Sequence, residues 1–291
     1  MRRFLILALA LVMALGMGNA FAETQEGEWE NILLLGGDAR NMNQYDRTDT
    51  MMILSINRDE AQVKMTSVMR DTWVELPGMG RSEKINAANV YGGPELAVET
   101  VNQNFGTDIE DYVIVNMEDL VQIVDILGGV DLEITERERV QINNGVKDYI
   151  SAVKGASAYT GDRTLNQSGL VHLNGIMAVS YCRIRKIDSD YSRVMRQQKV
   201  MLALAEKAQN MEIDELTKVA GDIYHIISTS LTEEEIKSMA TAFMVMEVSE
   251  VGQYRIPVDG TFQSGMFNGV WMIKPDLAEN QALLHQFIYG E

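Results

Sequence analysis

Four arginines lie close together in the stretch RIRKIDSDYSRVMRQQ, residues 183–198. Residues 181–199 contain six Lys/Arg and two Asp, although the formal net charge of the whole chain is -17. Like charges repel by up to about 4 kcal/mol per pair at about 4 Å in a surface-like dielectric, so a fixed arginine cluster needs an anionic partner. Guanidinium groups match phosphate oxygens bidentately, which makes phosphate or pyrophosphate the natural ligand. The alternative is a set of ion pairs with Asp188, Asp190 and surface glutamates.

The expected local structure would gather these arginines. A strand around Tyr181–Arg185 would place Arg183 and Arg185 on the same face. A long helix from about Ser192 to Asn210 would place three further side chains on one helical face: Arg193, Arg196 and Gln197. The short connection between strand and helix then predicts one pocket lined by several guanidinium groups.

A second group of charged residues surrounds LLLGGDARNMNQYDRTDT. Asp38 and Arg40 follow an expected buried strand, and Arg47 and Asp49 precede the next one. Ligands of α/β sheets usually sit outside strand ends. Two nearby carboxylates, in a chain without a Cys/His cluster, suit a hard cation such as Mg²⁺ that can also bind phosphate oxygens. The alternative is that Asp38 and Asp49 are turn and capping residues.

A third group lies in SVMRDTWVELPGMGRSEKINAANV. Arg70 and Asp71 end a strand, and Lys84 and Asn86 come shortly before a helix. Arg70 would add a phosphate donor, while Asp71 could orient that arginine or accept a proton from an attacking hydroxyl. The alternative is a local Arg–Asp ion pair that ends the strand.

The elements that must position these residues alternate between strands and helices. Strands are expected at 29–37, 50–57, 62–69, 112–115 and 130–134, with helices at 94–106 and 116–127. Residues 136–167 are polar and poorly periodic, and are interpreted as an inserted excursion or flexible cover. A hairpin around Tyr254–Met272 and a helix from Asp276 to Tyr289 close the chain. The order predicts a single-domain α/β fold, a three-layer α-β-α sandwich around a mixed central sheet.

Residues 1–22 have the features of an export signal. Arg2 and Arg3 precede an apolar run from Phe4 to about Met17, and Ala20-Phe21-Ala22 resembles a cleavage site. The segment is expected to be a signal peptide or a signal anchor, so the domain at 28–290 should lie outside the cytoplasm.

The overall composition narrows the partners further. A sequence pI near 4.6 disfavours binding to nucleic acid, which needs a broad basic face. The single cysteine, Cys182, cannot form an internal disulfide and is interpreted as a buried structural residue.

Together these stretches resemble the LytR-CpsA-Psr (LCP) family of bacterial cell-envelope proteins. The resemblance covers nearly the whole chain after residue 22 and rests on motifs in one order: NILLLGGDAR, RTDTMMILSIN, MRDTWVELPG, KINAANVYGGPELAVETV, YVIVNMEDLVQIVDILGGVDLEI and GLVHLNGIMAVSYCRIRKIDSDYSRVMRQQKV. It implies an α-β-α sandwich that holds a polyprenyl-pyrophosphate lipid in an apolar tunnel. It also implies Mg²⁺-dependent transfer of a phosphorylated glycopolymer, such as a teichoic acid or capsule, to peptidoglycan.

The resemblance also assigns roles to individual residues. Asp38 and Asp49 match the metal-binding aspartates, with Mg²⁺ or alternatively Mn²⁺ as the ion, and Arg47 matches the neighbouring catalytic arginine. The expected catalytic set is Arg47, Asp49, Arg70, Asp71, Arg183 and Arg185. The expected pyrophosphate-binding set is Arg40, Lys84, Asn86, Arg193, Arg196 and Gln197.

The implied reaction is attack by a sugar C6 hydroxyl of peptidoglycan on the glycan-side phosphorus, with polyprenyl phosphate leaving. The same pocket could instead serve a polyprenyl-pyrophosphate hydrolase, or a non-enzymatic module that binds envelope lipids and regulates. Many family members have a clear membrane anchor, whereas this leader ends in the cleavage-like sequence AFA. The protein is therefore expected to be secreted or associated with the outer face of the cytoplasmic membrane.

Overall fold

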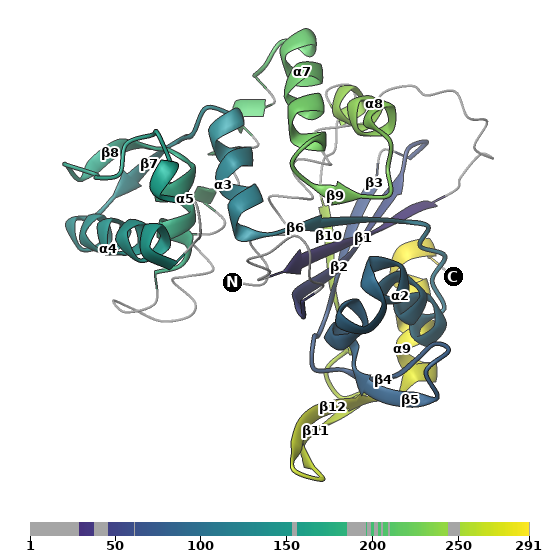
Figure 1. Cartoon of the computed structure of the whole chain (residues 1–291). Coiled ribbons are helices and arrows are strands. Elements are labelled where there is room, and N and C mark those ends of the chain that lie inside the picture. Colours follow the sequence, from purple (N-terminus) through teal and green to yellow (C-terminus); the bar gives the residue numbers. More distant parts are fainter. Residues whose placement is uncertain are drawn as a thin grey trace. The chain divides into compact units, whose positions relative to one another are not determined.

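The computed structural model of the chain (Figure 1) describes residues 29–37, 46–60, 62–152, 156–184, 196, 199–200, 203–204, 206–208, 210–243 and 251–290. They fall into two compact units. The sheet unit takes its residues from 20–114, 228–232 and 246–291, and the helical unit from 115–227 and 233–245. The leader, residues 1–22, lies outside the described residues.

The sheet unit is built on a six-stranded mixed sheet with the order β10-β3-β2-β1-β6-β9. β1 (Trp29–Gly37) and β2 (Thr48–Asn57) are antiparallel, as are β2 and β3 (Gln62–Val68). β10 (Val251–Ile256) pairs parallel to β3. β6 (Asp111–Val115) pairs antiparallel to β9 (Ser228–Thr229).

The centre of this sheet is buried on both faces. Residues 31–36 of β1 and 50–57 of β2 are all buried, so neighbouring side chains on opposite faces are both shielded from water. α2 (Ala88–Phe105) and α9 (Leu277–Tyr289) contribute to the core on one face, where Phe105 and Leu284 join Leu33 and Ile53. The buried central sheet is the middle layer that a sandwich requires. The predicted α/β class with a mixed central sheet is confirmed.

Two hairpins extend from the sheet unit (Figure 1). β4 (Trp73–Leu76) pairs with β5 (Arg81–Lys84), and the 3-10 helix η1 (Ile85–Ala87) connects β5 to α2. β11 (Phe262–Phe267) pairs with β12 (Val270–Pro275). The hairpin expected around Tyr254–Met272 was therefore misplaced: Tyr254 belongs to β10 in the central sheet, and the hairpin begins at Phe262.

The helical unit contains α3 (Met117–Ile126), α4 (Glu136–Ala152), α5 (Gly175–Cys182), α7 (Ile213–Tyr224) and α8 (Glu233–Phe243). A two-stranded sheet of β7 (Val130–Ile134) and β8 (Gly169–Leu173) accompanies them, together with the 3-10 helix η2 (Ala156–Ala158).

Local signals explain where these helices begin and how they pack. Asn116 and Asp119 form a reciprocal capping box at the start of α3, and the Asn174 side chain caps α5. A Cβ atom on Gly175 would lie 2.0 Å from the carbonyl oxygen of Val121, so only glycine permits this approach of α5 to α3.

Two expectations for this unit are wrong. The segment expected to be an irregular excursion contains α4, whose buried stripe is only Ile142, Val146 and Tyr149, too sparse to stand out in a polar sequence. The expected strand at Tyr181–Arg185 is also wrong, because Tyr181 and Cys182 end the buried helix α5. Arg183 is the C-cap residue of this helix, so the expectation that Arg183 and Arg185 share one strand face is wrong.

In the part of the chain that the structure describes, no helix has the length and apolar character needed to cross a membrane.

Candidate functional site

Five predicted charged residues of the sheet unit that the structure describes lie where β2 begins and β3 ends: Arg47, Asp49, Arg70, Asp71 and Lys84. The antiparallel register pairs Met52 with Ser67, and its continuation brings Asp49 opposite Arg70. An Arg70 Nη1 to Asp49 Oδ1 ion pair joins these side chains. β1 ends beside them, because Gly37 pairs with Thr48. The sheet thus places the end of β1, the start of β2 and the residues that follow β3 at one edge.

Asp71 connects Arg70 to the neighbouring hairpin. Its Oδ2 lies 3.3 Å from Arg70 Nε, and its Oδ1 accepts from Lys84 Nζ at 3.0 Å. Lys84 is the last residue of β5 and pairs with Trp73. The local Arg70–Asp71 pair considered from the sequence is therefore present, and it forms one part of a longer chain of alternating charges.

Arg47 is held on another side of the same cluster. Its Nη1 donates to Asn86 Oδ1 at 3.4 Å, while Asn86 is only 4% exposed and its backbone N–H donates to the Arg70 carbonyl at 3.4 Å. The backbone around Asp46 is held by Asn89, whose Nδ2 donates to the Asp46 carbonyl at 2.8 Å. A buried amide thus links Arg47 to the strand end that carries Arg70.

We call Arg47, Asp49, Arg70, Asp71, Lys84 and Asn86 the sheet-edge cluster. It contains three cations and two carboxylates, so the cations exceed the anions by one. The carboxylates offset the repulsion between cations when no ligand is bound. Partly exposed guanidinium and ammonium groups at a strand edge can then donate to an anion with several oxygens, for which phosphate is the best match.

Two further predicted arginines that the structure describes, Arg183 and Arg196, belong to the helical unit. Arg183 is exposed at the C-cap of α5, and it has no ion-pair partner among the residues described. Arg196 is 3% exposed; its Nη2 donates to the Ile184 carbonyl at 3.1 Å, and its Nη1 lies 3.5 Å from Glu138 Oε1. Glu138 is not among the residues expected from the sequence to form the site, because the segment around it was not expected to be helical.

Several predicted site residues lie outside the described residues. They are Asp38, Arg40, Arg185, Arg193 and Gln197. Their assignments remain predictions from the sequence.

Metal and thiol chemistry can be assessed for the described part of the chain. No group of three or more His, Cys, Asp or Glu side chains that could hold a metal ion occurs there. Burial raises the pKa of the Cys182 thiol, so this side chain is a poor nucleophile and fits its predicted structural role.

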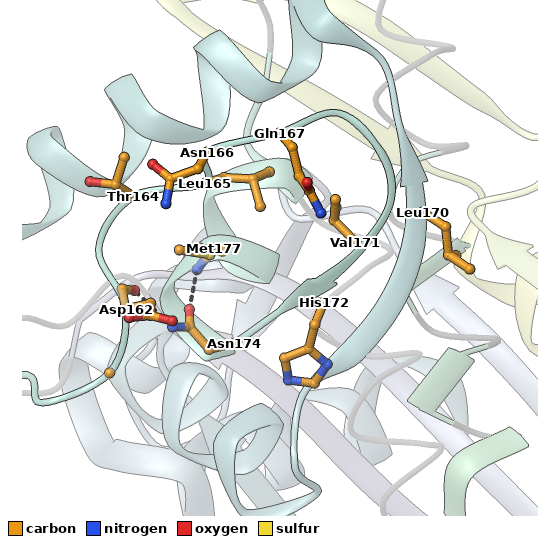
Figure 2. Close-up of a pocket in the computed structure, with 11 residues that line it drawn as sticks. Asp162, Thr164, Leu165, Asn166, Gln167, Leu170, Val171, His172, Asn174 and Met177 are labelled. Atoms are coloured by element: carbon orange, nitrogen blue, oxygen red, sulfur yellow. Dashed lines mark hydrogen bonds between the residues drawn. The ribbon is translucent and has the colours of Figure 1, made fainter.

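A separate polar pocket of about 630 Å³ lies in the helical unit (Figure 2). It is lined by Gly161, Asp162 and residues 164–167 of one loop, by residues 170–172 of β8, and by Asn174 and Met177 at the beginning of α5. Two neighbours fix the backbone of the loop: Asn143 donates to the Leu165 carbonyl at 3.0 Å and accepts from its N–H at 2.7 Å, and Asn174 donates to the Asp162 carbonyl at 2.8 Å.

The pocket combines an apolar floor with polar side chains. Leu165, Val171 and Met177 are buried, whereas Thr164, Asn166 and Gln167 are exposed. These three exposed side chains make no hydrogen bond to another described residue. Among the described lining residues there is no Lys or Arg, and the titratable ones are Asp162 and His172. Such a pocket offers hydrogen bonds without a fixed positive charge.

The mixed six-stranded sheet and the arginine, lysine and aspartate cluster at its edge define an α/β protein suited to phosphate-containing ligands. The chain belongs to the LytR-CpsA-Psr family, whose family model matches residues 16–287 in one continuous match that includes both units.

Relatives and solved structures agree with this assignment. The chain is 32% identical over 263 residues to the polyisoprenyl-teichoic acid–peptidoglycan teichoic acid transferase TagU of Bacillus mycoides strain KBAB4, covering 89% of this chain and 78% of that protein. The crystal structure of B. subtilis TagV matches with a TM-score of 0.63 at 24% identity, over 91% of this chain and 98% of that one. TagT with bound octaprenyl pyrophosphate matches with a TM-score of 0.58 at 23% identity, over 94% and 96% of the two chains.

Proposed function

We propose that this protein is a transferase that moves an anionic glycopolymer, in the manner of teichoic acid attachment, from a polyprenyl-pyrophosphate carrier to peptidoglycan. The main structural support is the sheet-edge cluster, in which Arg70 pairs with Asp49, Lys84 pairs with Asp71, and Arg47 donates to Asn86. The printed activity of TagU and the lipid bound to TagT support the same choice of substrates.

In this proposal the cations of the cluster bind the two phosphates of the lipid carrier. A peptidoglycan hydroxyl attacks the glycan-side phosphorus and forms the new P–O bond, while the bond to the bridging oxygen breaks and polyprenyl phosphate leaves. The hydroxyl proton passes to a base. Arg47 and Arg70 stabilise negative charge on the transferring and leaving phosphates, where phosphoryl-transfer catalysis chiefly acts. Asp71 is a positioning residue, because its two oxygens contact Arg70 and Lys84.

A Mg²⁺ ion fits the chemistry of this site. Magnesium is commonly bound by one or two carboxylates plus substrate phosphates and water, so it does not require a group of three protein ligands. Asp49, together with Asp38 after β1, would hold the ion, with Mn²⁺ as an alternative. When bound, the ion would neutralise charge on the phosphate oxygens.

The protein is proposed to act at the outer face of the cytoplasmic membrane. Curated relatives act on peptidoglycan, which lies outside the cytoplasm. The basic and apolar pattern of residues 1–22 supports export, either as a cleaved signal peptide or as an anchor.

The direct test incubates the purified full chain with a polyprenyl-pyrophosphate-linked saccharide, Mg²⁺ and peptidoglycan oligomers, and detects the conjugate by mass spectrometry. We expect conjugate with the wild type, loss of it in EDTA with recovery on adding Mg²⁺, and a decrease of about a hundredfold or more in Arg47→Ala. Arg58→Ala is the matched control, because Arg58 is an exposed arginine of the same unit that pairs with Glu30.

Other outcomes would redirect the assignment. Free phosphorylated saccharide without conjugate would indicate a polyprenyl-pyrophosphate hydrolase. An Arg47→Ala or Asp49→Ala protein that still complements a deletion strain would contradict both enzymatic functions and support a lipid-binding regulatory module.

A further inference from the structure

The β11–β12 hairpin ends in an apolar tip, residues 266–271. Asn268 and Gly269 both have positive φ, at 49° and 79°, as a two-residue hairpin turn requires. Met266 pairs with Trp271, and Phe267 pairs with Val270. Residues directly opposite one another share a face, so each face of the tip carries two apolar side chains. Met266 and Trp271 are 64% and 51% exposed.

The charge of this hairpin differs from that of the rest of the chain. Residues 260–275 contain Lys274 and no carboxylate, although the whole chain carries a formal net charge of -17. Lys274 Nζ lies 4.1 Å from the centre of the Phe267 ring. The tip is apolar and contains Trp271, and Lys274 follows it on β12. These features suit the interfacial region of a lipid bilayer, where Trp is enriched and anionic head groups attract cations.

The base of the hairpin is hydrogen-bonded to the backbone of a residue in the sheet-edge cluster. The backbone N–H of Ile273 donates to the carbonyl of Asp71 at 2.9 Å, and Thr72 forms a parallel bridge with Ile273. Gly269 is four residues from Ile273, so the tip extends roughly 13 Å beyond that hydrogen bond at about 3.3 Å per residue. Figure 1 shows the hairpin projecting beyond β4 and β5 of the same unit.

We propose that the hairpin tip inserts into the interfacial region of a lipid bilayer and holds the sheet-edge cluster near the membrane surface. Insertion of the tip into a bilayer does not depend on the proposed transferase function. Its use for catalysis does rest on that function, since the pyrophosphate of a polyprenyl carrier lies at the membrane surface. A glycan partner fits less well, because Asn268 is the only polar side chain between Met266 and Trp271. A flat protein partner would cover one face of the tip, whereas both faces are apolar.

The test needs a local readout, since the apolar residues 4–17 could contact lipid on their own. An environment-sensitive NBD label on Asn268→Cys would be measured in the full chain with and without phosphatidylcholine–phosphatidylglycerol vesicles that contain no polyprenyl lipid. Cys182 is buried and should not react. We expect a blue shift and a severalfold rise in intensity at position 268, and none with the label on Gln286→Cys, an exposed position of α9.

Met266→Ser with Trp271→Ser, in the Asn268→Cys protein, should abolish that response, whereas Ile213→Ser, which changes an exposed apolar residue of α7, should leave it intact. An unchanged spectrum at position 268 on adding vesicles, or a response that survives the double substitution, would overturn the proposal. A response to peptidoglycan fragments in place of vesicles would do the same and indicate a glycan contact. Failure of transfer activity would not affect this measurement.

The polar pocket of the helical unit carries a second, independent inference. We infer that it binds a neutral saccharide with hydroxyl and acetamido groups. The Asn166 and Gln167 amides can both donate and accept hydrogen bonds, and the Leu165, Val171 and Met177 floor suits the C–H face of a sugar ring. The absence of Lys and Arg among its described lining residues disfavours a phosphorylated polymer. If the proposed function holds, the occupant is the peptidoglycan acceptor strand.

Chitotetraose, a neutral N-acetylated saccharide, is the probe, and its binding to the full chain would be followed by NMR titration. Asn166→Ala with Gln167→Ala should weaken binding at least about tenfold. The control pair, Gln263→Ala with Gln286→Ala, removes two exposed amides of the sheet unit and should have no effect. The inference would be overturned if the wild type did not bind chitotetraose, or if the double variant bound it as well as the wild type. It would also be overturned if N-acetylglucosamine 6-phosphate, a phosphorylated sugar, bound more tightly than the neutral N-acetylglucosamine. Binding without transfer would count against the proposed function alone.

Discussion

At the scale of single residues, Asn86 shows how a neutral side chain can support a charged site. Its side chain is buried and accepts from Arg47, and its backbone N–H donates to the strand end that carries Arg70. Arg47 is exposed, so without this acceptor its long side chain would sample many rotamers. Asn86 therefore acts through Arg47 as a positioning residue.

This role predicts coupling between the two side chains. Asn86→Ala should lower the rate of transfer about five- to tenfold, because it removes one hydrogen bond to a charged group. In an Arg47→Ala protein, the same change should have almost no further effect. Transfer rates of the wild type, both single variants and the double variant would measure the coupling. Additive losses would show that Asn86 acts independently of Arg47.

At the scale of elements, the start of α3 contains a carboxyl group with an unusual environment. Burial raises the pKa of Asp119 to about 6, although the capping box with Asn116 opposes this shift. The folded protein then holds this proton more tightly than the unfolded chain does. The contribution of this group to stability is therefore present below about pH 4 and is lost as the pH rises through about 6.

Asp119→Asn should remove that pH dependence. Its amide oxygen can still accept from the Asn116 N–H, while no charge is buried above pH 6. Relative to the wild type, the variant should gain up to roughly 3 kcal/mol between pH 4 and pH 7, as the shift of about two units implies. Urea unfolding at both pH values would measure the difference. Asp148→Asn, an exposed change in α4, is the control, and an equal gain there would contradict the explanation.

The contact between α3 and α5 gives a second prediction for elements. Gly175→Ala would place a methyl group 2.0 Å from the Val121 carbonyl oxygen, so the two helices must separate. We expect a loss of about 2 kcal/mol or more in the free energy of unfolding, and a lower Tm. Gly265→Ala, where the nearest atom is 4.0 Å away, should change little. Similar losses for both variants would argue against helix contact as the cause.

At the scale of the whole molecule, the charge distribution is compatible with a local anion site and disfavours general binding to polyanions. The chain has a formal net charge of -17, and the excess of cations in the sheet-edge cluster is one. Such a molecule can bind one pyrophosphate group but repels a long phosphate backbone. The family match extends over residues 16–287, so it includes residues of both units.

This charge distribution predicts no binding to nucleic acid. Fluorescence anisotropy with a double-stranded DNA oligomer should show no change at micromolar protein and near-physiological salt, where a basic binding face would give a clear signal. Binding that falls steeply with salt would show that the basic groups act together as such a face.

The sequence by itself determined the elements whose signals are local. Three such signals are the continuous apolar run of β1, the Asn116 cap of α3 and the Asp276 cap of α9. Each depends only on residues close by in sequence, and all three elements occur as expected. It also predicted, through motif order, the family and all six residues of the sheet-edge cluster.

Only the tertiary structure decided features that depend on distant residues. The apolar pattern around Tyr181 and Cys182 fits a strand or the end of a helix equally well, and the contacts of α5 with α3 and α4 go with a helical end. The ion pair of Asp49 with Arg70 and the hydrogen bond of Ile273 to Asp71 join residues that are far apart in sequence. Charge type is encoded in each residue, but which charges meet depends on strand register and packing, which no local signal contains.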